Sequence, residues 1–226
     1  MARGSLARRC VAEAFATFAL VFAGCGAIVA DSERGGSLGA VGIAAAFGLA
    51  IMVMVYATGH VSGAHINPAV SIAFAVSRHF PARDALAYVP AQLAGAVGGA
   101  VLLRLTWSGT PADLGATTPT LGAGAAFAYE LVLTGLLMFV IVSVATDTRA
   151  AGPAAAIAIG GTVALGALVG GETSGGSLNP ARSFGPALVA SEWTQFWIYI
   201  VAPVAGALTG AVLYGIVRGR AGRPSS

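Results

Sequence analysis

Long runs of apolar residues, separated by short polar stretches, occupy nearly the whole chain. Six of these runs cover about residues 11–30, 38–58, 84–105, 123–146, 154–170 and 194–217. A helix rises about 1.5 Å per residue, so about 20 apolar residues cross the roughly 30 Å hydrocarbon core of a bilayer. The pattern therefore predicts an all-α membrane protein with six transmembrane helices.

Two shorter apolar runs, about residues 67–77 and 179–190, begin at an Asn-Pro pair and follow loops of small and polar residues. Asn is a favoured helix N-cap, and Pro at the first helical position gives up no intrahelical hydrogen bond. A helix of some eleven residues is only about 16 Å long, which is half of the hydrocarbon core. We therefore expect two re-entrant half-helices, each reached by a loop that descends into the membrane.

The two Asn-Pro segments are copies of one another. Ser62-Gly63-Ala64-His65-Ile66-Asn67-Pro68-Ala69-Val70-Ser71 aligns without a gap with Ser174-Gly175-Gly176-Ser177-Leu178-Asn179-Pro180-Ala181-Arg182-Ser183. The outer spans repeat as well, because residues 91–102 match residues 202–213, and Glu13 and Glu130 are each followed by Thr four positions later. The chain is therefore an internal duplication with slightly different loop lengths.

Each half holds three full spans, an odd number, so the halves enter the membrane in opposite orientations. We expect one transmembrane domain over residues 1–226, built from inverted repeats at about 10–105 and 123–218. Most of the twelve arginines fall on one side of this arrangement: Arg3, Arg8, Arg9, Arg78, Arg83, Arg149, Arg218, Arg220 and Arg223. Basic residues gather on the cytoplasmic side, which predicts an integral protein of the plasma (inner) membrane with cytoplasmic N- and C-termini.

Composition agrees with a membrane protein and excludes several other classes. Hydrophobic residues make up 57% of the chain and charged residues 9%, against roughly a quarter charged in soluble domains. The net charge of +3 reflects topology, and we expect no nucleic-acid partner. Cys10 and Cys25 would lie about 22 Å apart on one helix and cannot pair. Because no nucleophile, base and orienter stand together, we expect no enzyme, no cofactor and no metal site.

Two half-helices that enter from opposite faces would meet N-terminus to N-terminus near the midplane, where inverted-repeat proteins usually place their solute site. Their dipoles would place about half a positive charge each at the centre. Such a field repels protons and cations, whereas a neutral solute could accept hydrogen bonds from the Asn67 and Asn179 amides. Irregular backbone persists at that depth only where it is buried or lines a wet cavity.

These features resemble the aquaporin (major intrinsic protein) family over essentially the full chain. Both family boxes are intact, namely Asn67-Pro68-Ala69 and Asn179-Pro180-Ala181, and Arg182 follows the second. Residues 59–70 and 175–188 are similar to the nodulin-like intrinsic branch. The resemblance implies the aquaporin fold of six transmembrane helices and two half-helices. It also implies a homotetramer in the lipid bilayer, with a pore in each protomer.

By the same resemblance, the family's narrow filter falls on Phe47, Ala167, Gly176 and Arg182. Water-selective members typically have His at the position of Ala167 and a bulkier residue at that of Gly176, so a wider constriction is implied here. Glycerol facilitators typically have Asp where this chain has Ser183. The motifs thus indicate a channel mechanism clearly, whereas they point to different classes of solute.

The hypothesis is a passive channel for water and small uncharged solutes, such as glycerol, urea and undissociated metalloid hydroxides like arsenite or boric acid. It would exclude protons and ions. A water-selective aquaporin is the alternative within the family. Glu13 and Glu130 are the carboxylates well inside spans, and intramembrane acids can serve proton-coupled transport. A proton-coupled secondary transporter is therefore the rival class, although the resemblance implies that both carboxylates support loop backbone.

Overall fold

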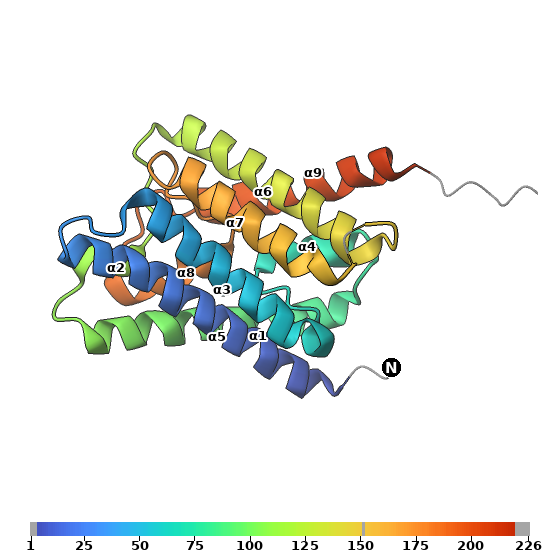
Figure 1. Cartoon of the computed structure of the whole chain (residues 1–226), viewed down its shortest axis with the longest axis horizontal. Coiled ribbons are helices and arrows are strands. Elements are labelled where there is room, and N and C mark those ends of the chain that lie inside the picture. The colour runs from blue at the N-terminus through green and yellow to red at the C-terminus, as the bar shows by residue number, and fades with distance from the viewer. Residues whose placement is uncertain (1–3, 151, 220–226) are drawn as a thin grey trace, which may run out of the picture.

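A computed structural model describes residues 4–150 and 152–219, and within them it contains helices and loops but no strand. Arg3, Arg220 and Arg223 lie outside the described residues. The elements are α1 (Leu6–Leu20), η1 (Val21–Cys25), α2 (Gly26–Glu33), α3 (Gly39–Ser62), α4 (Pro68–Val76), α5 (Ala82–Thr106), η2 (Pro111–Gly115), α6 (Ala123–Thr146), η3 (Gly152–Ala154), α7 (Ala155–Gly170), α8 (Pro180–Ala190) and α9 (Ile198–Arg218). Figure 1 shows the long helices lying side by side, with the start of α1 and the end of α9 at the same end of the bundle.

The six expected spans are all helical. Among the described residues, five helices are long and apolar enough to cross a membrane: Leu6–Glu33, Gly39–Ser62, Ala82–Thr106, Ala123–Thr146 and Ile198–Arg218. The remaining span, α7, is apolar but has 16 residues, which corresponds to about 24 Å. The first span is one continuous helix in which η1, a π-helical turn, joins α1 to α2.

Several helix ends differ from the sequence prediction by a few residues, and the backbone explains two of them. The second span was expected to end near residue 58, but α3 continues through Gly59 to Ser62 and stops where Gly63 has φ 92°. A left-handed φ is open to glycine at little steric cost, so Gly63 and not Gly59 ends the helix. The last span begins at Ile198 instead of near residue 194, because Gln195 has φ 51° in the preceding turn.

The two short helices begin directly after their asparagines. The Asn67 side chain accepts a hydrogen bond from the Ala69 N–H, and the Asn179 side chain accepts one from the Ala181 N–H. With 9 residues in α4 and 11 in α8, they are about 14 Å and 17 Å long. End to end, the two together match the roughly 30 Å hydrocarbon core that each transmembrane helix crosses alone.

The helices pack in pairs that repeat across the two halves. α1 packs against α5 and α6 against α9, while each half-helix lies on the last helix of the other half, α4 on α9 and α8 on α5. Close approach depends on glycine, because a Cβ on Gly95 or Gly206 would overlap the carbonyls of Ala14 and Leu131. The small-residue spacing seen in the sequence therefore brings these helix backbones into contact.

Ion pairs tie the helix ends where the chain starts and finishes. Arg9 of α1 binds Asp84 of α5 at 2.9 Å. Asp147, just beyond α6, lies 2.6 Å from Arg149 and 3.3 Å from Arg218 of α9. Hydrogen bonds from the Arg149 side chain and backbone hold the pKa of Asp147 well below its ordinary value. Asp147 therefore stays ionised at neutral pH and fixes the end of α6 to the end of α9.

Candidate functional site

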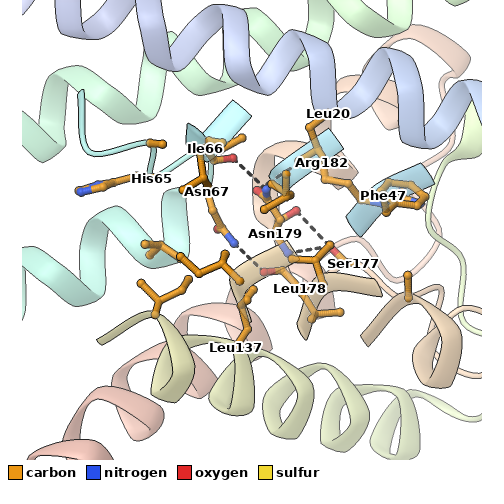
Figure 2. Close-up of a pocket in the computed structure, with 18 of the residues that line it drawn as sticks. Leu20, Phe47, His65, Ile66, Asn67, Leu137, Ser177, Leu178, Asn179 and Arg182 are labelled. Atoms are coloured by element: carbon orange, nitrogen blue, oxygen red, sulfur yellow. Dashed lines mark hydrogen bonds between the residues drawn. The ribbon is translucent and has the colours of Figure 1, made fainter. Parts of the chain in front are cut away.

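The N-termini of α4 and α8 meet at the centre of the molecule. The Asn67 Nδ2 donates to the Leu178 carbonyl at 2.8 Å, and the Asn179 Nδ2 donates to the Ile66 carbonyl at 2.9 Å. Figure 2 shows these two bonds crossing between the loops. Each asparagine thus caps its own helix through Oδ1 and donates a hydrogen bond to a carbonyl of the opposite loop through Nδ2. An amide has two N–H groups, so one further N–H on each side is available to a solute.

A narrow cavity of about 70 Å³ runs past both asparagines. Water needs roughly 10–15 Å³ of such space per molecule, so only a handful fit at once. Polar groups enter the wall from the two loops, from the asparagines and from Arg182. The rest of the wall is largely apolar and includes Leu20, Ile51, Val55, Val70, Phe74, Leu137, Ile141, Ile159 and Val163.

A wider pocket adjoins each end of this cavity, and the residues that a pocket shares with the cavity mark a neck. The pocket beside Asp31 and Glu172 shares Phe47, Ala167, Gly176 and Arg182 with the cavity. The pocket at the opposite end shares Gly63, His65, Phe74 and Ala145. The structure therefore brings together, at one neck, the four residues that the resemblance assigns to the filter, from α3, α7, the second loop and α8.

At this first neck, Arg182 is held on two sides. Its Cζ lies 4.7 Å from the centre of the Phe47 ring, within the range of a cation–π contact. Its Nη1 donates to the Gly115 carbonyl at 2.6 Å. Its buried Nε has no acceptor among the described protein atoms. The guanidinium is therefore fixed in place at the neck, which it lines.

Sequence reasoning missed the part that the loop between α5 and α6 takes in this neck. Leu114 and Gly115 of that loop are buried, and Ala112, Asp113 and Leu114 have φ values of 47°, 47° and 54°. Left-handed backbone at three non-glycine residues is rare. The contact between Gly115 and Arg182 joins segments 67 positions apart, so no local sequence pattern predicts it.

Glu13 supports the loop before the first box. Its Oε1 accepts hydrogen bonds from the Ser62 hydroxyl at 2.7 Å and from the His65 N–H at 2.9 Å. Its Oε2 accepts from the Ile66 N–H at 2.7 Å and from the Gln92 side chain at 2.9 Å. Ile66 has φ 56°, a strained value for a β-branched residue. The carboxylate holds this residue so that its carbonyl faces Asn179.

Glu130 does the same for the second loop. Its Oε1 accepts from the Ser174 hydroxyl at 2.7 Å and from the Ser177 N–H at 2.8 Å, and its Oε2 accepts from the Leu178 N–H at 2.8 Å. Leu178 has φ 55°, and its carbonyl faces Asn67. Both carboxylates are fully buried. In each half, a buried carboxylate therefore accepts hydrogen bonds from the loop that precedes the half-helix.

The second neck centres on His65. Its Nδ1 lies 3.0 Å from the Ser71 hydroxyl, and its ring packs on Phe74, Phe80 and Tyr88 at centroid distances of 5.1, 4.6 and 5.3 Å. No group of three or more potential metal ligands occurs in the part of the chain that the structure describes. His65 therefore braces the loop at this end of the cavity.

Apolar helices around two inward half-helices, with a narrow cavity past their meeting point, define a membrane channel. The profile of the family described as "Major intrinsic protein" matches residues 1–214. The chain is 48% identical to Aquaporin NIP1-1 of Zea mays, covering 93% of this chain and 75% of that protein. It is 47% identical to Nodulin-26 of Glycine max, covering 93% and 78%.

Among solved structures, the aquaglyceroporin from Plasmodium falciparum superposes with a TM-score of 0.87 at 26% identity, covering 95% of this chain and 98% of that chain. The chain therefore belongs to the major intrinsic protein family, and it is an integral membrane protein with the aquaporin fold. The family consists of channels and not enzymes, which confirms the expectation drawn from the sequence. The all-α prediction of the fold is likewise confirmed.

Proposed function

We propose that this protein is a passive channel for water and small uncharged solutes, including glycerol, urea and undissociated metalloid hydroxides such as arsenite or boric acid. One observation carries the proposal. At the first neck, Ala167 and Gly176 contribute little or no side chain, while Phe47 and Arg182 supply one apolar wall and one donor. A polyol has an apolar C–H edge for the Phe47 wall and hydroxyl acceptors for Arg182, and a small metalloid hydroxide offers hydroxyl acceptors of the same kind, so both suit such a neck.

Exclusion of ions follows from the charges around the cavity. The N-termini of α4 and α8 contribute about half a positive charge each at the centre, and Arg182 adds a full charge at the neck. A cation is repelled at both places, and a proton moving along a water file is repelled in the same way. An anion would have to leave its hydration shell between largely apolar walls. A neutral solute meets neither barrier.

The relatives support this range of solutes by name only. The chain is similar to a protein described as an aquaglyceroporin and to several described as aquaporins.

We further propose one channel domain over residues 1–226, formed by inverted repeats at about 10–105 and 123–218. Both termini would be cytoplasmic, in the plasma (inner) membrane. Four copies would form a homotetramer.

The rival class, a proton-coupled transporter, receives no support from the contacts of its two candidate residues. Glu13 accepts four hydrogen bonds and Glu130 accepts three, and all the donors belong to the protein. A relay carboxylate must release and rebind a proton, which here would break the support of both loops. Flux measurements distinguish the proposed broad-solute channel from the alternative within the family, a water-selective aquaporin.

The test of the proposed function is a shrink–swell measurement on proteoliposomes with several osmolytes. We expect the protein to raise the permeability of vesicles to water, glycerol, urea and arsenous acid, without saturation and without a pH gradient. Empty liposomes and a strict water channel serve as references. If glycerol and arsenite pass no faster than through the strict water channel, the broad-solute proposal fails and the water-selective alternative stands.

Ala167→His combined with Gly176→Ala should narrow the first neck. Filling space in a packed site costs about 1–3 kcal/mol, which corresponds to roughly tenfold or more in rate. We expect glycerol permeability to fall by at least about tenfold and water permeability to fall much less. Gly176 has φ 57°, a value close to the φ of 47° that Ala64 adopts at the matching position of the first box. A Cβ on Gly176 would come within 3.0 Å of the Gly171 nitrogen, so the second loop must shift slightly to admit alanine.

Stopped-flow permeability ratios of glycerol to water measure this effect. Gly161→Ala is the matched control, because Gly161 lies on α7 and a Cβ there would meet nothing within 4 Å. Equal loss of glycerol and water permeability in the double variant would remove Ala167 and Gly176 from the filter.

A further inference from the structure

The first transmembrane helix is irregular where it passes the first neck. The turn Val21–Cys25 is π-helical, and single π-turns inside α-helices are often found at functional sites. The matching helix of the second half, α6, is a regular α-helix from Ala123 to Thr146. The turn is therefore a feature of one half of the duplication.

Gly24 of this turn lies directly behind the aromatic wall of the neck. A Cβ placed on Gly24 would overlap the ring of Phe47 at its Cδ1, Cε1 and Cγ atoms. The Phe47 ring thus occupies the space that a side chain at position 24 would fill. The same ring contacts Arg182 and lines both the cavity and the pocket beside Asp31 and Glu172, which we call the outer pocket.

The next residue of the turn supports the other wall. A Cβ on Gly115 would come within 2.8 Å of the Cys25 Cβ and 3.0 Å of its Cα, so the Gly115 backbone packs tightly on Cys25. Gly115 in turn accepts the hydrogen bond from Arg182. Two neighbouring residues of one π-turn therefore back the two large side chains of the neck, Phe47 and Arg182.

We propose that Gly24 determines solute size by allowing the Phe47 ring to lie back against α1, away from the passage. The ring is buried on the α1 side and faces open space on the side of the cavity. The open spaces beside the ring are the cavity and the pocket that adjoins it, so a side chain at position 24 would displace the ring into the passage. This inference rests on the proposed function, because it concerns which uncharged solutes pass the neck. The width of the neck is set by Gly24 as well as by the four residues that line it.

Gly24→Ala tests the proposal. We expect the ratio of glycerol to water permeability in proteoliposomes to fall about tenfold, since the displaced ring adds a barrier of the order found for overpacked sites. Gly24→Ala with Phe47→Val should restore the ratio to the wild-type value or above it. Such rescue is not expected if Gly24 serves only helix packing.

Gly26→Ala is the matched control on the same helix, because its Cβ would meet Leu103 at 3.3 Å and not the neck. It should keep the wild-type ratio. Permeabilities are normalised to the folded protein recovered as a single peak by size-exclusion chromatography. A wild-type ratio in Gly24→Ala, or a low ratio that persists after Phe47→Val, overturns the proposal.

Failure of the proposed function would be visible separately, in wild-type protein that passes water alone. In that case water permeability becomes the readout for position 24. It should fall in Gly24→Ala and recover with Phe47→Val, and unchanged water permeability in Gly24→Ala would overturn the role of Gly24.

Discussion

Arg182→Val is expected to make the channel leak protons and alkali cations and to admit larger polyols. Among the described residues that line the first neck, namely Phe47, Ala167, Gly176 and Arg182, Arg182 is the one that carries a charge. At an effective dielectric constant near 20, two unit charges 4 Å apart interact by about 4 kcal/mol. Removing that repulsion raises cation passage by about a hundredfold or more.

Size selectivity should change together with charge selectivity. Valine would leave the Gly115 carbonyl without its donor at 2.6 Å and the Phe47 ring without its cation at 4.7 Å. Both walls of the neck would therefore lose a fixed neighbour. The half-helix dipoles and the asparagines remain, so we expect a partial leak and not an open ion pore.

Proton and cation flux is measured with pH- and potential-sensitive dyes in proteoliposomes, beside glycerol and water permeability. Arg182→Lys keeps the charge and should retain most of the cation barrier, although it loses the fixed fork of donors. Arg104→Val removes an exposed arginine near the end of α5 and controls for a general loss of charge. Wild-type ion exclusion together with a wild-type glycerol to water ratio in Arg182→Val would remove Arg182 from this role.

Much of the fold could be predicted because its signals are local. Apolar length specifies the spans, and an asparagine followed by proline starts each half-helix whatever surrounds it. The duplication adds a strong constraint, because an odd number of spans per half inverts the second copy. The end of α3 was predicted wrongly because Gly59 and Gly63 look alike in the sequence. Gly63 has the left-handed backbone that ends the helix, whereas Gly59 lies within it.

The neck could be predicted only in part, because several of its supports are contacts between distant segments. Phe47 and Ala167 were located by counting from the boxes, which depends on resemblance and not on any local pattern. The Gly115 carbonyl that holds Arg182 lies 67 positions away in the chain. Gln92, which links Glu13 to Ser71 at 2.9 Å and 3.0 Å, looked like an ordinary polar residue of a span. The π-turn that contains Gly24 has no sequence signal of its own.

Glu130→Gln is expected to destabilise the whole protein. It is not expected to abolish a proton-coupled uptake while leaving the fold intact. The carboxylate accepts two N–H groups and one hydroxyl, with both oxygens in use. A glutamine has one acceptor oxygen, so its NH₂ must face the N–H of Ser177 or Leu178. Losing a charged hydrogen bond and leaving a buried donor unpaired costs about 3–5 kcal/mol, a large part of a typical folding free energy of about 5–15 kcal/mol.

The loss of stability in Glu130→Gln should appear as a lower yield of folded protein and a lower melting temperature in detergent. The fluxes of water and glycerol should fall in proportion. Leu178 would be freed from its strained φ of 55°, and its carbonyl would no longer face Asn67, so both solutes lose the same passage. Glu172→Gln, at an exposed position beside the outer pocket, is the matched control and should behave as wild type.

A proton-coupled transporter would behave differently. Its wild type would show saturable uptake driven by a pH gradient, and Glu130→Gln would fold normally and abolish that uptake alone. That pair of results would contradict the structural role of Glu130 and the channel proposal together.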